Sequence, residues 1–169
     1  MTVLSRNLLI LAPLWLGSQA LAQGAGCNGS EHFNDFDFWL GQWNVTDNSS
    51  SNVAGSNTIT KDLNNCLVME NWTGASGSIG KSINYFNPLR QEWRQVWVAP
   101  GYVIDITGGL ENSVMVLTGS IDYFTDKRYD FRGSWTPSDD GSVRQFFEQY
   151  DPDSQEWNTW FDGRYEINQ

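Results

Sequence analysis

The sequence predicts an all-β protein in which a single antiparallel meander closes into a barrel of about ten strands. Three observations lead to this prediction. Short segments rich in β-branched and aromatic residues recur at intervals of about 10–12 residues. Turn-forming runs such as Asn87-Pro88 and Asp139-Asp140-Gly141 separate these segments. No stretch shows the sustained 3.6-residue periodicity of a helix.

The elements follow in order along the chain. His32–Leu40 is the one helical candidate, and we expect a short helical turn there, ahead of the first strand. The expected strands are 42–47, 55–61, 65–73, 80–87, 92–99, 102–108, 113–120, 127–136, 142–150 and 157–167. An open ten-stranded meander would leave two exposed edges, so closure is favoured. A two-sheet sandwich is the alternative, but its crossovers need long links, and the sequence has few.

The N-terminus has the pattern of an export signal. Residues 1–22 combine the positive Arg6, the short apolar core Leu8–Leu16 and a small-residue cleavage motif that ends at Ala22. This core is too short to span a membrane, so we expect cleavage and a periplasmic or secreted protein without a membrane span. Residues 23–169 then form one domain.

The two cysteines, Cys27 and Cys66, are predicted to form a disulfide, because paired thiols oxidise in exported proteins. Such a bond would tie the N-terminal segment to the strand expected at 65–73. Two unpaired thiols are one alternative. A lipid anchor on Cys27 is the other, although Gly24 occupies the position where a lipidation motif usually has leucine.

Composition excludes several classes of function. The chain has 20 Asp+Glu against 10 Lys+Arg, so its net charge of −10 disfavours nucleic-acid binding. Aromatic residues make up 14% of the chain, too large an apolar content for disorder. His32 is the sole histidine, which disfavours a Ser–His–Asp triad and a multi-histidine metal site. We therefore expect neither a metal nor a cofactor.

A candidate ligand site lies in the segment from Glu70 to Trp97. If the turn between Asn87 and Glu92 closes a hairpin, alternate residues of its two strands share one sheet face. The opposite pairs on that face are Phe86–Trp93, Asn84–Gln95 and Ser82–Trp97. A second register, across the Gly- and Ser-rich loop Gly74–Gly80, is less constrained. It pairs Trp72 with Ser82 and Glu70 with Asn84.

These registers predict a polar row framed by aromatic rings. The predicted ligand-binding residues are Glu70, Trp72, Asn84, Phe86, Trp93, Gln95 and Trp97. Apolar walls with a few convergent polar groups are typical of a pocket for a small molecule, here a flat or sugar-like one. A buried Glu70 would have a raised pKa and could act as an acid or base. Alternatively, the row is a structural network or faces water, because the opposite face is not purely polar.

The hairpin near the C-terminus shows the ordinary pattern of apolar residues inside and charged residues outside. A register centred on Asp139 places Phe131, Trp135, Val143 and Phe147 on the inner face. The outer face then carries Asp130, Arg132, Arg144 and Glu148. We expect this hairpin to be structural.

Gly41-Gln42-Trp43, at the start of the first expected strand, resembles the Gly-x-Trp signature of lipocalins and other calycins, whose relatives include fatty-acid-binding proteins. A wider pattern resembles a group of exported bacterial proteins of unknown function, from about Phe33 to Tyr165. Its segments are Phe36–Trp43, Cys66 with Glu70-Asn71-Trp72, Gly80–Pro88 and Trp93–Val98. The resemblance implies a calycin-like barrel and no particular activity. The related nitrobindins bind haem through a C-terminal histidine, which this chain lacks.

Three hypotheses for function follow. The leading one is an exported barrel that binds a small, mostly apolar, aromatic or sugar-like ligand in its lumen, without chemistry. The second is a lyase or isomerase that uses Glu70 as acid or base. The third is an interaction protein whose aromatic face contacts another envelope component.

Overall fold

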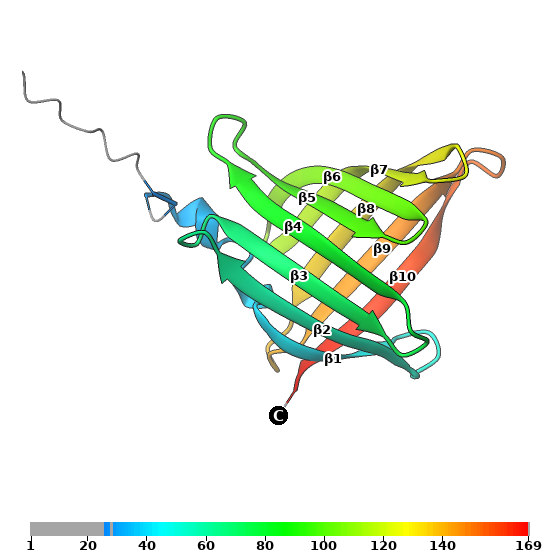
Figure 1. The fold of residues 1–169 in the computed structure, drawn as a ribbon, viewed down its shortest axis with the longest axis horizontal. Coiled ribbons are helices and arrows are strands. Elements are labelled where there is room, and N and C mark those ends of the chain that lie inside the picture. The colour runs from blue at the N-terminus through cyan, green and yellow to red at the C-terminus, as the bar shows by residue number, and fades with distance from the viewer. Residues whose placement is uncertain (1–25, 28, 169) are drawn as a thin grey trace, which may run out of the picture.

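Each strand pairs with its neighbour in the chain, and β1 also pairs with β10, so the sheet closes into a ten-stranded antiparallel barrel (Figure 1). This computed structural model describes residues 26–27 and 29–168. Closure leaves no unpaired edge, which removes the main hazard of a long meander. The predicted fold class is therefore confirmed. The predicted signal peptide, residues 1–22, lies outside the described residues.

All ten expected strands are present, with ends that differ by a few residues from the predicted ones. Their bounds are β1 Gly41–Asp47, β2 Val53–Asp62, β3 Leu67–Gly74, β4 Ile79–Asn87, β5 Glu92–Ala99, β6 Tyr102–Glu111, β7 Val114–Tyr123, β8 Lys127–Pro137, β9 Val143–Asp151 and β10 Glu156–Ile167. The helical turn expected at His32–Leu40 consists of two 3₁₀ turns, η1 Glu31–Asn34 and η2 Asp37–Trp39.

The two 3₁₀ turns cover one end of the barrel, which we call the closed end (Figure 1). Phe36 is fully buried there, and its ring meets Trp93 edge-on at 5.6 Å and Trp135 at 5.1 Å between centroids. Trp43, of the Gly-x-Trp motif, donates its indole N–H to the Trp39 carbonyl oxygen at 2.9 Å. Interlocked rings therefore fill the closed end of the lumen.

Alternation of side chains separates the two faces of the sheet over most of its length. The inner apolar residues expected in the C-terminal hairpin, Phe131, Trp135, Val143 and Phe147, are all buried. On the outside, arginines pair with acidic residues across neighbouring strands, as Arg132 does with Glu148 at 2.6 Å. The predicted faces of this hairpin are thus confirmed.

The structure confirms one predicted register and corrects two. Across β4 and β5 the pairs are Phe86–Trp93, Asn84–Gln95 and Ser82–Trp97, as expected. Across β3 and β4, however, Glu70 lies opposite Ser82 rather than Asn84, and Trp72 lies opposite Gly80. Across β8 and β9, Phe131 pairs with Gln149 rather than Phe147. Both corrections are shifts of two residues, so every side chain keeps its predicted face.

The two shifted hairpins share one turn geometry, which explains the error. In the β3–β4 loop the Gly74 N–H donates to the Ser78 carbonyl, and the Gly77 N–H donates to the Gly74 carbonyl. The β8–β9 loop repeats both bonds, with Gly141 in the place of Gly77. These glycines have φ of 88° and 80°. A three-residue loop that ends in a left-handed glycine is a recognised hairpin connection, and it sets the centre of each hairpin.

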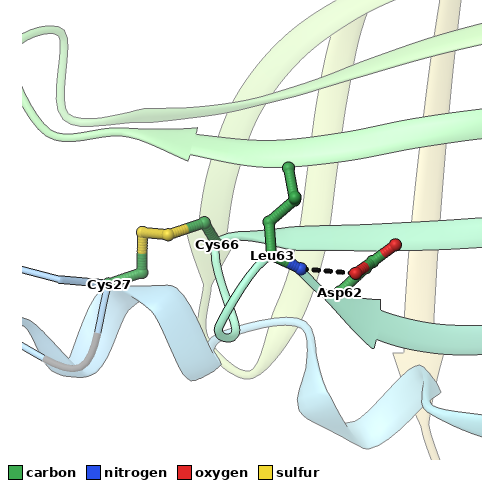
Figure 2. The surroundings of a disulfide bond; sticks show 4 residues. All are labelled: Cys27, Asp62, Leu63 and Cys66. Atoms are coloured by element: carbon green, nitrogen blue, oxygen red, sulfur yellow. Dashed lines mark hydrogen bonds between the residues drawn. A yellow bond between two sulfur atoms is a disulfide. The ribbon is translucent and has the colours of Figure 1, made fainter.

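Cys27 and Cys66 form the expected disulfide, with their Cα atoms 5.0 Å apart (Figure 2). Cys66 lies in the turn between β2 and β3, one residue before β3, and not within a strand as expected. In the same turn the Leu63 N–H donates to the Asp62 carboxylate at 2.6 Å (Figure 2). The bond therefore ties the segment that precedes η1 to the closed end of the barrel.

Removal of the disulfide should lower the free energy of unfolding by about 4 kcal/mol, because the bond closes a loop of roughly 40 residues in the unfolded chain. Chemical denaturation of the oxidised protein and of a Cys27→Ser/Cys66→Ser double variant measures the difference. A change below about 1 kcal/mol would show that the bond does not restrain the unfolded chain in this way.

Candidate functional site

A cavity of about 470 Å³ occupies the end of the barrel opposite the 3₁₀ turns, which we call the open end. The β1–β2 and β3–β4 links border it, together with the adjoining ends of β5, β6 and β10. Its aromatic walls are Trp72, Trp97, Tyr102, Phe147, Trp160 and Phe161. A cavity of this volume falls in the range of ligand pockets.

Two β-bulges shape this end of the barrel. In β10 the register with β9 shifts between Thr159 and Phe161, so Trp160 has no partner residue, and both Trp160 and Phe161 line the cavity. A similar shift between β1 and β2 leaves Ala54 at the cavity wall. Bulges redirect side chains at barrel rims. Here they bring to the cavity a ring that strict alternation would turn away.

Glycines let the rings lie close to the sheet. A Cβ atom at Gly80 would overlap the ring of Trp97, and one at Gly133 would lie 2.5 Å from an atom of the Phe147 ring. Each glycine thus accepts the face of a ring from the neighbouring strand. The rings of Trp97 and Phe147 therefore line the cavity wall close to the sheet.

Glu70 is the polar centre of the cavity, and its carboxylate accepts two hydrogen bonds. Asn57 Nδ2 donates to Oε1 at 2.7 Å, and Ser82 Oγ donates to Oε2 at 2.6 Å. Behind Ser82 the row continues, with Asn84 Nδ2 donating to Ser82 Oγ at 2.9 Å and Gln95 Nε2 donating to Asn84 Oδ1 at 2.8 Å. These four hydrogen bonds therefore run toward the carboxylate, while Asn84 Nδ2 also donates to the Val68 carbonyl oxygen at 3.1 Å.

Burial raises the pKa of Glu70 to about 7, against an ordinary value of 4.5. The hydrogen bonds from Ser82 and Asn57 act in the opposite direction, because they favour the ionised carboxylate. Removal from water is the larger effect, since Glu70 is only 2% exposed. Glu70 therefore changes its charge near neutral pH.

Other buried polar groups lie at the same cavity. Gln145 is 4% exposed, and its Oε1 has no hydrogen-bond partner among the described residues. Tyr165 is almost fully buried, and its hydroxyl accepts a long hydrogen bond of 3.4 Å from Asn57 Nδ2. Burial raises the pKa of Tyr165 far above its ordinary value, so its hydroxyl stays neutral. A buried oxygen without a partner costs free energy unless something else satisfies it.

All seven sequence-predicted ligand residues are on inner-face positions, but they do not meet in one place. Glu70, Trp72 and Trp97 line the cavity. Asn84 and Gln95 are fully buried behind Ser82 and reach the cavity only through hydrogen bonds.

The other two predicted residues lie at the closed end. Phe86 packs edge-on against Phe33 at 5.4 Å, and Trp93 packs in the same way against Phe36. Their rings belong to the packed core that the 3₁₀ turns complete. The predicted aromatic frame is thus divided between a cavity wall and a structural core, because alternate residues of one strand lie at increasing distance from the open end.

The sequence prediction missed several residues of the site. These are Asn57, Ser82, Tyr102, Ile104, Gln145, Phe147, Trp160, Phe161 and Tyr165. Asn57 alternates with glycine and Ile59 on an inner strand face, so an inward polar residue could have been noticed there. Gln145 likewise sits between the inner positions Val143 and Phe147. Trp160 gave no such signal, because its position depends on a bulge.

Among the described residues that line the cavity there are carboxylates, Glu70 and Asp47, but no Lys, Arg or His. Within residues 26–27 and 29–168, no group of three or more His, Cys, Asp or Glu is placed to hold a metal ion. The described part of the chain also contains no helix long and apolar enough to cross a membrane. Comparisons with protein-family models and with curated proteins find no match.

The Glu70→Gln variant should remove a pH dependence of stability. The unfolded carboxyl loses its proton above about pH 4.5 and the folded one only near 7, so the native protein becomes less stable as pH rises through this window. The shift corresponds to about 3 kcal/mol between pH 4.5 and pH 8. Denaturant unfolding of both proteins across this range measures the difference, and a difference that does not vary with pH would contradict the assignment.

Proposed function

We propose that the protein binds a small organic molecule in the open end of its barrel, with the apolar part among the rings and a polar group at Glu70. The observation that carries this proposal is the coincidence of a cavity of about 470 Å³, aromatic walls and a buried carboxyl at one place. Largely apolar pockets with a few fixed polar groups are the usual sites for small ligands.

The unequal filling of the barrel supports this proposal. At the closed end, Phe36, Trp39 and Trp135 are fully buried and pack ring against ring. At the open end the barrel retains a cavity, and the Gln145 oxygen lies unpaired beside it among the described residues. A ligand with a hydrogen-bond donor would fill the space and satisfy that oxygen.

We also propose that the protein acts outside the cytoplasm. The Cys27–Cys66 disulfide is consistent with an oxidising compartment. The signal-peptide pattern over residues 1–22 and the expected cleavage after Ala22 support the same location. The ligand would then be a molecule of the periplasm or of the surroundings.

An Ile104→Phe substitution should weaken binding at least tenfold, because Ile104 lines the cavity, is 1% exposed and would carry a larger side chain into the ligand space. Ile83→Phe, on the outer surface of β4, is the matched control. Quenching of tryptophan fluorescence by a panel of hydrophobic probe molecules measures the affinity. Equal affinity in both variants, with both folded, would place the probes elsewhere.

A second candidate function is acid–base catalysis, as in a lyase or isomerase, and the pKa of Glu70 favours it. A carboxyl that titrates near pH 7 exchanges protons efficiently at neutral pH. If a substrate is turned over, Glu70→Gln should abolish turnover and leave the fold and the affinity for substrate largely intact. Turnover that survives the substitution would exclude Glu70 as the proton donor or acceptor.

A further inference from the structure

The charges around the cavity indicate the class of ligand, an inference that rests on the function proposed above. We propose that the cavity selects organic cations: a protonated amine would lie against the Glu70 carboxylate, and its apolar part would lie among the aromatic walls. Three features of the structure support this choice of ligand class. They are the lack of a positive partner for Glu70, the commitment of the arginines elsewhere, and the aromatic composition of the walls.

Glu70 has hydrogen bonds but no counter-charge. Its donors are the neutral Asn57 and Ser82, and no described residue that lines the cavity is Lys, Arg or His. A buried carboxylate is strongly stabilised by a nearby positive charge. No described side chain that lines the cavity can supply one, whereas a ligand with an ammonium group brings both a positive charge and N–H donors.

The arginines of the sheet are held on the outer face by acidic partners. Arg94 binds Asp105 through two nitrogen–oxygen contacts. Arg144 binds Asp162 in the same way, and each of its two contacts measures 2.8 Å. Further outer pairs are Arg132–Glu148 and Arg164–Asp140. These cations are therefore not placed to neutralise the lumen, and the net charge of −10 adds a field that attracts positive ligands.

The walls suit a cation as well as an apolar group. Trp160 is held by its indole N–H, which donates to Tyr123 OH at 3.1 Å, and Trp72 packs edge-on against Phe161 at 6.1 Å. Faces of Trp and Tyr rings attract ammonium groups, most strongly where water is excluded. Fixed rings around a buried carboxylate thus favour an amine over a neutral molecule of the same shape.

The same groups oppose an anion. A carboxylate or phosphate ligand would meet Glu70 at the cavity wall and Asp47 at its entrance. Asp47 remains ionised there, because hydrogen bonds from Ser49 and Ser50 lower the pKa of its carboxyl. A fatty acid is therefore a poor fit, although the walls are apolar enough to receive its chain.

Binding of a cation should be coupled to release of the Glu70 proton. The titratable groups that face Glu70 across the lumen are Tyr165 of β10 and Tyr102 of β6, with Asp47 at the entrance. Burial raises the pKa of both tyrosines, so they stay neutral between pH 6 and pH 8. Glu70 is then the cavity group that changes charge in this interval, and the carboxylate form is the one that binds the amine.

The test compares three probes of nearly equal size: naphthylethylamine, naphthylethanol and naphthylacetate. Isothermal titration calorimetry at pH 8 should show the amine binding at least tenfold more tightly than the alcohol, and the acid most weakly. At pH 6 the affinity for the amine should fall by about tenfold, because most of Glu70 is then protonated. Titrations of the amine at pH 6, in two buffers with different ionisation enthalpies, should detect the proton that Glu70 releases on binding.

The Glu70→Gln variant separates charge from shape. It should lose the preference for the amine and the pH dependence of amine binding, so that the variant binds the amine and the alcohol with similar affinity. Equal binding of the three probes by the native protein would overturn the cation proposal and leave lumen binding intact. The same conclusion would follow if none of the three probes bound while hydrophobic probes still quenched the tryptophan fluorescence. If no probe binds to the native protein or to the Ile104→Phe variant, lumen binding itself is overturned.

Discussion

Glu70 brings an ionisable carboxyl into the interior of a barrel whose other buried polar side chains are Asn, Gln, Ser and Tyr. Removal of this group from water is unfavourable, and the rest of the site is arranged around it. Asn57 and Ser82 each direct a donor at one of its oxygens, and Asn84 and Gln95 in turn orient Ser82. Four strands, β2 to β5, are thereby linked through one carboxylate, and partial compensation leaves its pKa near 7.

The aromatic residues of the barrel lie in two groups, one at each end. At the closed end, rings from the 3₁₀ turns pack against Trp93 and Trp135, and the disulfide fixes the segment that carries them. At the open end, Trp160 and Phe161 stand beside a cavity that no chain segment of the described structure fills. The ring packing of the core is thus concentrated at the closed end, away from the cavity.

The strands and their faces could be predicted from the sequence, because a period of two decides which side chains point inward, and hairpin turns with Pro and Gly mark the ends. The hairpin registers could be predicted less well. Gly77 and Gly141 each end a three-residue loop, and the loop moves the strand pairing by two residues from the predicted register. The partners of Glu70 were harder still. Asn57 approaches it from the preceding strand, through a β2–β3 register that the sequence does not show. Tyr165, which accepts a hydrogen bond from Asn57, comes from the far end of the chain, and that contact depends on closure of the barrel.

Stability alone does not account for a glutamate at position 70. A glutamine has nearly the same shape and would avoid the cost of a buried charge above pH 7. Its single oxygen could accept from Ser82, and its amide group could donate to Asn57 Oδ1, which has no partner among the described residues, once the Asn57 amide turns over. What glutamine cannot supply is a negative charge or a group that gains and loses a proton near neutral pH. The cost of the buried carboxyl is therefore in keeping with the ligand that we propose for the open end, where the wall carries no positive side chain among the described residues.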